Sequence, residues 1–231
     1  MTPALVIFDC DGVLVDSEAI ANRIMAEHIT ATGIPIAYED CRARFVGGTL
    51  QRVMDTVEQW LGKPLPPGWK DDFEARRNEA FRRELKAVAG VEEVLQRLAR
   101  VGTEICVASS GTVAKMELTL GLTGLKRYFG ERLFSASMVA HGKPEPDIFL
   151  YAAEQMGYLP ETCVVVEDSP TGVTAAVAAG MRVLAYAADT DAEILRAAGA
   201  HPFAEMAELP GLLSLDADLR ERAGQVTSGQ M

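Results

Sequence analysis

Two patterns of apolar and polar positions alternate along much of this chain. One is a short run of apolar residues, as in a buried strand, and the other is a segment with regularly spaced apolar residues. Between the later apolar runs, apolar residues recur every three or four positions, as on one face of a helix. Strands that alternate with helices favour a parallel, doubly wound sheet, so we expect an α/β core with a Rossmann-like arrangement. The apolar runs predict strands at residues 4–8, 104–108, 133–135, 162–166 and 182–186. The spaced apolar positions predict helices at 91–98, 113–120, 147–156 and 172–179.

One segment departs from this alternation and is helical throughout. Its apolar stripes predict helices near residues 18–32, 39–45, 50–61 and 69–85. This segment is nearly neutral, whereas the remainder carries nearly all of the excess negative charge. We therefore expect two domains: an all-helical cap at residues 15–87, inserted into an α/β core formed by residues 1–14 and 88–231.

Composition and charge narrow the functional classes. The 231 residues are 48% hydrophobic and 24% charged, as in most soluble globular proteins. A net charge of −11 argues against nucleic acid as the main partner, because phosphate backbones bind basic surfaces. The apolar runs are far shorter than the roughly 20 residues that cross a bilayer, so no membrane partner is expected. Asp9 and Asp11 interrupt the N-terminal apolar segment, which argues against a signal peptide. We expect a cytoplasmic protein, either a monomer or a weak homo-oligomer.

The cysteines and histidines show no metal-binding pattern. The three histidines are scattered, and the four cysteines match no zinc spacing. Cys106 and Cys163 lie in or beside apolar runs, where a thiol behaves as a small hydrophobic group. We expect all four cysteines to be reduced.

Two aspartates, Asp9 and Asp11, stand at the end of the first apolar run. Residues two apart in a strand point to the same face, so both carboxylates would lie at one strand end. Burying two like charges without compensation costs several kcal/mol. A divalent cation, a shared proton or a lysine would remove that cost. The same pair also fits a calcium loop or a plain Asp-Gly turn.

Other polar residues follow the later strands, where active sites of parallel sheets lie. Ser109 and Ser110 precede a predicted helix, so they could form an anion site with free N–H groups or a simple helix cap. Lys143 stands between a glycine and a proline, although most lysines are solvated surface charges. Glu167 and Asp168 directly follow an apolar strand. A helix cap explains one of these two acids, and Mg²⁺ would explain both.

Taken in order, these four stretches resemble the motifs of the haloacid dehalogenase superfamily of phosphohydrolases. The helical insert between the first and second motifs resembles the cap of its β-phosphoglucomutase-like branch. The resemblance extends to about residue 213. The stretches that carry it are Asp9-Cys10-Asp11-Gly12-Val13, Ser109, Lys143-Pro144-Glu145-Pro146-Asp147 and Glu167-Asp168-Ser169-Pro170-Thr171-Gly172.

The resemblance implies a Mg²⁺-dependent phosphatase that acts on a small phosphorylated metabolite. Asp9 would be the nucleophile that forms an aspartyl-phosphate, and Asp11 the general acid and base. Ser109, Ser110 and Lys143 would bind the phosphoryl group. The implied metal ligands are Asp9, Asp11 through its backbone carbonyl, Asp168, and Glu167 either directly or through another ligand.

Several alternatives belong to the same superfamily. The presence of Asp11 argues against a dehalogenase, and the absence of lysine from residues 18–32 against a phosphonoacetaldehyde hydrolase. A sugar phosphomutase would carry a cap histidine near the position of Ala21, whereas His28 lies about two turns later. Its basic cap loop would correspond to Val46-Gly47-Gly48-Thr49-Leu50, which has no basic residue. A non-catalytic binding protein is disfavoured because all four motifs are intact.

The substrate depends on the cap. Arg44, Thr49 and Arg52 could contact a phosphosugar or sugar acid, but basic residues on cap helices are more often solvated. The run Arg76-Arg77 and Arg82-Arg83 is expected at the surface. The cap would close over the site with hinges near residues 15–17 and 87–90.

Overall fold

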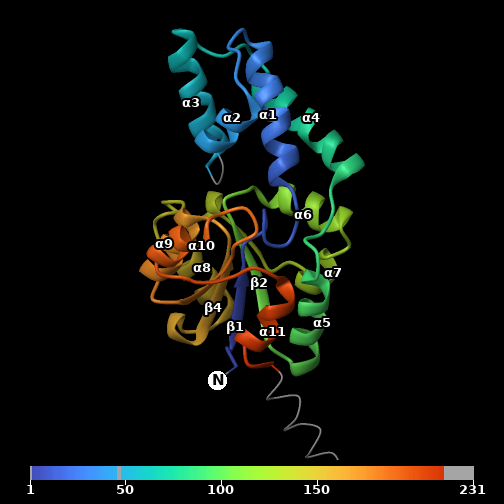
Figure 1. Ribbon diagram of the computed structural model, residues 1–231, viewed down its shortest axis with the longest axis vertical. Helices are drawn as coiled ribbons and strands as arrows, with labels where there is room; N and C mark the ends of the chain where they lie inside the picture. Colours follow the sequence, from blue (N-terminus) through green and yellow to red (C-terminus); the bar gives the residue numbers. More distant parts are fainter. Residues whose placement is uncertain (1, 46–47, 216–231) are drawn as a thin grey trace, which may run out of the picture.

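The sheet of the core is centred on the first strand of the chain. The computed structural model describes residues 2–45 and 48–215, and Figure 1 shows the helical cap lying at one end of the sheet. The six strands of these described residues are all parallel, in the order β3-β2-β1-β4-β5-β6. The chain winds outward from β1 in both directions, so the predicted doubly wound α/β fold is confirmed. The strands are β1 (Leu5–Phe8), β2 (Glu104–Ser109), β3 (Leu133–Ser135), β4 (Cys163–Glu167), β5 (Arg182–Tyr186) and β6 (His201–Phe203).

Helices cover both faces of the sheet. Val6 and Phe8 face one apolar cluster, while Leu5 and Ile7 face the other. Both faces of β1 are therefore buried, which explains its uninterrupted apolar sequence. The first face is covered by α5 (Val91–Val101), α6 (Val113–Leu122), α7 (Lys126–Phe129) and α11 (Leu209–Leu212). The second face is covered by α8 (Asp147–Met156), α9 (Pro170–Ala178) and α10 (Ala192–Ala197).

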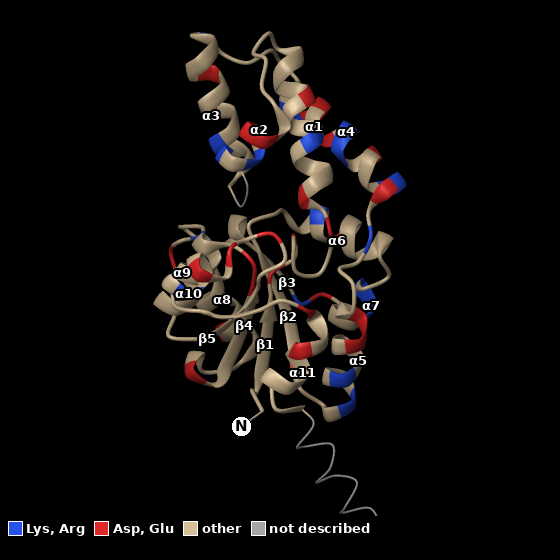
Figure 2. Ribbon diagram, viewed as in Figure 1, with Lys and Arg blue, Asp and Glu red and all other residues tan. Residues whose placement is uncertain are grey.

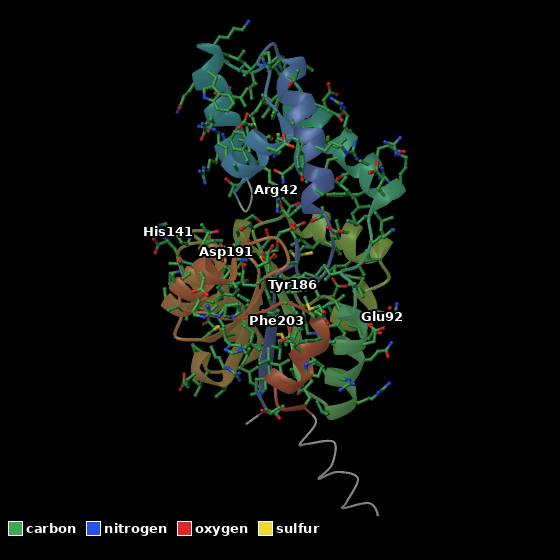
Figure 3. The ribbon with its side chains drawn as sticks, in the orientation of Figure 1. Arg42, Glu92, His141, Tyr186, Asp191 and Phe203 are labelled. Atoms are coloured by element: carbon green, nitrogen blue, oxygen red, sulfur yellow. The ribbon has the colours of Figure 1, made fainter. Side chains whose placement is uncertain are left out.

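The structure adds elements that the apolar pattern did not predict, namely β6, α7, α10 and α11. Strand β6 is three residues long and contains Pro202, which an edge strand tolerates because one side of it needs no donor. Its Phe203 ring lies 5.6 Å from that of Tyr186 on β5 (Figure 3). Helix α9 also begins two residues before its predicted start, because Ser169 caps it and Pro170 is favoured in the first turn.

The cap has a hydrophobic core of its own. Buried side chains from its helices, among them Ile29, Cys41, Val57 and Phe73, form a cluster distinct from the two clusters of the sheet. The helices are α1 (Glu18–Ala31), α2 (Tyr38–Phe45), α3 (Leu50–Leu61) and α4 (Trp69–Glu84).

The two connections between cap and core run side by side. Val15 forms an antiparallel bridge with Ala87, and the Asp16 N–H donates to the Lys86 carbonyl at 3.0 Å. Since both chain crossings occur at this one place, we propose domain boundaries near residues 15 and 87.

Two further expectations concern the described residues as a whole. All four cysteines lie buried with free thiols. Within residues 2–45 and 48–215, no helix combines the length and the apolar character that a membrane span requires.

Candidate active site

The carboxyl ends of β1, β2 and β4 bring three of the predicted site residues together. Asp9 follows β1, and its N–H donates to the carbonyl of Val166 at 2.9 Å. Ser109 and Glu167 are the last residues of the neighbouring strands β2 and β4. All three side chains are buried, although all three are polar. Figure 2 shows acidic residues gathered in the loops at this edge of the sheet, which faces the cap.

Lys143 reaches into this group from the loop between β3 and α8. Its Nζ donates to Asp9 Oδ1 at 2.5 Å, to Glu167 Oε1 at 2.6 Å and to the Ala108 carbonyl at 3.3 Å. The ring of Phe149 lies 5.0 Å below the ammonium group. The lysine side chain is 4% exposed, so this buried ion pair joins three segments of the chain. The alternative of a solvated surface lysine is therefore wrong.

Glu167 is anchored on both of its oxygens. While Oε1 faces Lys143, Oε2 accepts the N–H groups of Asp168 and Ser169 at 2.8 and 2.9 Å and the Ser169 hydroxyl at 3.0 Å. Burial alone would raise the pKa of Glu167, but Lys143 and these donors hold it below its usual value. A Cβ at Gly172 would lie 1.7 Å from Oε1, so this position admits only glycine. The contacts fit a residue that orients Lys143 better than a direct metal ligand.

Asp168 is the carboxylate that lacks a partner. Among the described residues, no hydrogen-bond donor or cation contacts its side chain, and burial raises its pKa well above the usual value, with Glu167 and Asp9 adding to the shift. Its Oδ2 packs against Gly12, where a Cβ would approach to 2.1 Å and where φ is +78°. Gly12 therefore makes room for the Asp168 carboxylate beside the Asp9–Asp11 loop.

These residues fit a Mg²⁺ ion. Burial raises the pKa of Asp9 to about 7 against the pull of Lys143, and Glu167 and Asp11 contribute to the rise. The site therefore holds more buried negative charge than Lys143 neutralises. The described residues contain no group of three or more His, Cys, Asp or Glu side chains placed to hold a metal. Mg²⁺ does not require one, because it commonly uses one or two carboxylates and keeps several waters.

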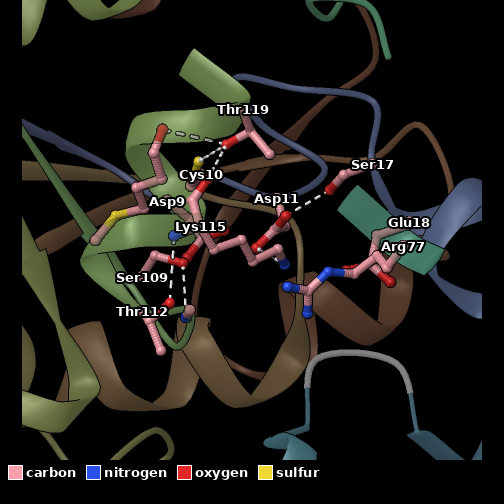
Figure 4. A network of polar contacts seen from close by, with 12 residues as sticks. Asp9, Cys10, Asp11, Ser17, Glu18, Arg77, Ser109, Thr112, Lys115 and Thr119 are labelled. Atoms are coloured by element: carbon pink, nitrogen blue, oxygen red, sulfur yellow. Dashed lines mark hydrogen bonds and ion pairs between the residues drawn. The ribbon is translucent and has the colours of Figure 1, made fainter. Parts of the chain in front are cut away.

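Asp11 contacts a different set of residues from the one around Lys143. Ser17 donates to its Oδ1 at 2.5 Å, and Lys115 donates to its Oδ2 at 2.8 Å (Figure 4). Burial acts to raise the pKa of Asp11, but these two donors lower it below its usual value. Since both oxygens of the side chain are engaged, the backbone carbonyl of Asp11 remains as the atom that could bind a metal.

Two basic residues of this site were not among the predicted ones. Lys115 lies one turn into α6, where its N–H donates to the hydroxyl of the capping Thr112 at 3.2 Å. A lysine one turn after the Ser-Ser-Gly-Thr stretch was the available indication. Arg77 was expected at the surface with Arg76, but it is half-buried and lines the cleft. For Arg77, the surface prediction is wrong, because one face of α4 packs against the cleft.

The predicted phosphate-binding serines lie in the loop that starts α6. Ser109 Oγ accepts the Gly111 N–H at 3.1 Å, and Thr112 caps the helix. Ser110 is half-buried, and both serines line the cleft with Lys143. The loop therefore presents hydroxyl and N–H groups at a helix N-terminus, an arrangement suited to anions.

The cleft between core and cap encloses a cavity of about 560 Å³. The core contributes Asp9, Asp11 and Lys143, and the cap contributes Arg44, Thr49 and Arg52 as anticipated. Ala21 also lines the cleft, where a mutase would place its histidine. His28 instead packs inside the cap, with Nε2 2.9 Å from the Trp69 carbonyl. The predicted mutase loop begins with Val46 and Gly47, which lie outside the described residues.

Comparisons with known proteins agree with this geometry. The chain is 31% identical over 208 residues to a 6-phosphogluconate phosphatase of Escherichia coli, covering 90% of this chain and 93% of the relative. It is 32% identical to hexitol phosphatase A of the same organism, covering 80% and 83% of the two chains. A crystal structure of a HAD family hydrolase from Deinococcus radiodurans, with bound phosphate and sodium, superposes with a TM-score of 0.75 at 31% identity, covering 93% and 97%.

A family model provides the final comparison. The model of the haloacid dehalogenase-like hydrolases matches residues 3–180, a range that includes the strand ends, the cap and the Lys143 loop. This chain therefore belongs to the haloacid dehalogenase-like hydrolases and is an enzyme of that family.

Proposed function

We propose that this enzyme hydrolyses the phosphate monoester of a small carbohydrate or sugar acid, with Asp9 as nucleophile and Mg²⁺ as cofactor. One observation carries the proposal: Lys143 holds the buried Asp9 carboxylate at 2.5 Å, within the cleft that Ser109 and Ser110 also line. The named relatives, which act on 6-phosphogluconate and hexitol phosphates, support a phosphorylated sugar as substrate.

We assign the two aspartates different roles in the reaction. Asp9 Oδ attacks phosphorus and forms a P–O bond, while the bond between phosphorus and the leaving alcohol breaks. Asp11 enters this step protonated and donates that proton to the leaving oxygen, although Lys115 and Ser17 favour its ionised form. It then removes a proton from the water that attacks the aspartyl-phosphate, releasing inorganic phosphate and restoring Asp9. Lys143, Ser109 and Ser110 bind the phosphoryl oxygens throughout.

The carboxylates of Asp9 and Asp168 and the backbone carbonyl of Asp11 would hold Mg²⁺. The ion would offset the repulsion between the nucleophilic carboxylate and the phosphoryl oxygens. Glu167 would act through its contact with Lys143. The half-buried Asp168 carboxylate, which no donor or cation of the described residues contacts, is the observation that supports this assignment.

The mutase alternative has less support in the cap. Ala21 lines the cleft where a histidine would be needed, and His28 faces the cap interior. No described cap residue supplies the missing imidazole to the cleft. We therefore propose water as the acceptor of the phosphoryl group.

A phosphate-release assay over small phosphate esters, with and without Mg²⁺, tests the proposal. We expect Mg²⁺-dependent release from a phosphorylated sugar or sugar acid, and loss of more than about 10³-fold in kcat in Asp9→Asn. Asp71→Asn, at an exposed position on α4, is the matched control and should behave as the unchanged protein. Normal turnover by Asp9→Asn would exclude the nucleophile assignment. Isomerisation of a sugar phosphate without phosphate release would favour the mutase.

A further inference from the structure

Asp11 marks the side of the cleft where the leaving alcohol would lie. Lys143 contacts Asp9 and Glu167, whereas Asp11 turns away from that group toward Ser17 and Lys115. The group that protonates the leaving oxygen has to contact it. Any side chain beside Asp11 therefore stands next to the leaving part of the substrate.

Lys115 occupies this position on the core wall. Its Nζ lies 2.8 Å from Asp11 Oδ2, and its side chain is 17% exposed to the cleft. Gly111 leaves room for the Lys115 side chain, because a Cβ at residue 111 would lie 3.3 Å from Lys115 Cδ. The ammonium therefore lies on the side of the cleft where the leaving part of the substrate would bind.

Arg77 approaches from the cap wall. Figure 4 shows its guanidinium pointing toward Asp11 and Lys115. The group lies over the rings of Phe73 and Phe81, at 5.3 and 5.8 Å, and donates to Asn78 Oδ1 through Nε at 3.3 Å and Nη2 at 3.1 Å. These contacts hold the guanidinium in a defined orientation.

Arg77 has no ion-pair partner among the described residues. No carboxylate of residues 2–45 and 48–215 lies within 4 Å of it, although burial lowers its pKa and the charges of Glu74 and Asp11 only partly compensate. A partly desolvated guanidinium is costly unless an anion accompanies it. By contrast, Arg76 on the same helix is exposed and pairs with Glu27 at 3.0 Å.

Two acidic residues, Glu18 and Glu74, line this cap wall, and among the described residues neither forms an ion pair with Arg77 or Lys115. Glu18 is drawn beside Arg77 in Figure 4, but its Oε2 accepts the amide of Asn22 at 2.9 Å and makes no ion pair in the described part of the chain. Burial raises the pKa of Glu18, and the negative charge of Asp11 adds to the rise. Arg44 and Arg52 of the cap are less suited to bind an anion beside Asp11. Both are exposed, and the Arg44 guanidinium lies over the Trp60 ring at 5.2 Å.

We infer that Arg77 and Lys115 form an anion subsite that binds a carboxylate or another negatively charged group on the leaving part of the substrate. This inference rests on the proposed function and narrows its substrate class to phosphorylated acids. An ammonium and a guanidinium that reach one place from opposite walls attract an anion between them, and guanidinium matches carboxylate geometry. The relatives' substrates differ in this respect, since 6-phosphogluconate carries a carboxylate and a hexitol phosphate does not.

Matched pairs of esters test this subsite. The two pairs are 6-phosphogluconate with glucitol 6-phosphate, and phosphoglycolate with 2-hydroxyethyl phosphate. We expect a preference for the acid of at least about 10-fold in kcat/KM in one pair. Arg77→Met should lower kcat/KM for that acid by about 10- to 100-fold, the range for a charged hydrogen bond, and should change the neutral ester less than about 3-fold. Arg77→Lys should restore part of the loss.

Controls and a second measurement keep the outcomes distinct. Arg76→Met removes a neighbouring charge outside the cleft and should leave both esters unchanged. Equal turnover of acid and neutral esters, or an equal loss of both in Arg77→Met, would overturn the subsite while leaving the phosphatase intact. Should no ester be hydrolysed, the proposed function fails, and calorimetric binding to Asp9→Asn with Mg²⁺ still decides the subsite. In that binding experiment, equal affinity for 6-phosphogluconate and glucitol 6-phosphate would overturn the anion subsite.

Discussion

Lys143 is the counter-ion of two buried carboxylates in the site, those of Asp9 and Glu167. Among the described residues, it is the one cation within 4 Å of either Asp9 or Glu167, and all three side chains are buried. Removing one partner from a buried ion pair is far more costly than removing an exposed pair, because the remaining charges have neither water nor a counter-ion.

For this reason, Lys143→Met should destabilise the fold by about 3–5 kcal/mol and abolish turnover. Urea unfolding measures the first effect and phosphate release the second. Lys126→Met is the control: Lys126 pairs with Glu117 at 3.3 Å at the surface, and its loss should cost at most about 1 kcal/mol. A Lys143→Met protein as stable as the control would contradict the role of Lys143 as the counter-ion.

Gly172 provides a second prediction at this scale. A Cβ there would overlap Glu167 Oε1 at 1.7 Å, so Gly172→Ala has to displace Glu167 and with it Lys143. We expect a loss of at least about 1–3 kcal/mol in the free energy of unfolding and a large drop in kcat. Gly121→Ala, inside α6 with no atom within 4 Å of the new Cβ, should instead stabilise by about 0.5–1 kcal/mol. Equal effects of the two changes on stability would refute the steric argument.

At the scale of elements, α1 and α4 form the contact on which the cap depends. His28 of α1 packs against the rings of Trp69 and Phe73 at 4.5 and 5.8 Å. Its Nε2 donates to the Trp69 carbonyl at 2.9 Å, and its Nδ1 accepts from Arg76 at 3.3 Å. Both contacts together require a neutral imidazole, since a protonated ring could not accept the Arg76 bond.

Acid should therefore weaken the cap through His28. Burial lowers the pKa of folded His28 below 6.5, the value for an unfolded chain, and Arg76 adds to this. The unfolded state then binds the proton more readily, so the stabilisation is present above about pH 6.5 and is lost as the pH falls through the folded pKa. Between pH 7.5 and about 5.5, His28→Gln should lose less stability than the unchanged protein in urea unfolding, whereas exposed His201→Gln should follow the unchanged protein. Parallel pH profiles for all three proteins would refute this.

At the scale of the molecule, the site lies where the two parts of the chain meet. Core strand ends supply the acids and Lys143, while α1 and α4 of the cap supply the opposite wall. Arg42 of α2 also pairs with Asp189 of the core at 3.2 Å, and Figure 3 shows it at the edge of the cap that faces the core. The cleft is therefore an interface, and a group bound in it would tie the two parts together.

Mg²⁺ should raise the thermal stability of the whole protein. An ion present at about 100 times its Kd that binds only the folded state adds about 2.7 kcal/mol, which corresponds to a rise of about 5–10 °C in Tm. The rise should be lost in Asp168→Asn, which removes the unpartnered carboxylate, and kept in Asp55→Asn on the exposed side of α3. Differential scanning calorimetry with and without Mg²⁺ measures both. A shift that persists in Asp168→Asn would place the ion elsewhere.

The sequence alone predicted the features that depend on local pattern. Within the part of the chain that the structure describes, apolar runs and helical stripes located five of the six strands and the four cap helices. A strand buried on both faces gives a continuous apolar run, and a helix buried on one face gives apolar residues every three or four positions. The site residues Asp9, Ser109 and Glu167 could be named because each stands at a strand end, where parallel strands converge, whereas Lys143 was named from the resemblance of its motif to a known family. Strand β6 was missed because its three residues take their place from pairing with β5.

Only the tertiary structure decided which charges share the cleft. Arg76 and Arg77 are adjacent and chemically identical, yet the turn of α4 directs one to solvent and Glu27 and the other toward Asp11. Lys115 carries no marker in the chain beyond its place one helical turn after the capping Thr112. A helical residue's surroundings depend on what packs against its face, and that packing joins segments far apart in sequence. Local pattern therefore determined the fold and the acids, and the meeting of cap and core determined the basic residues beside Asp11.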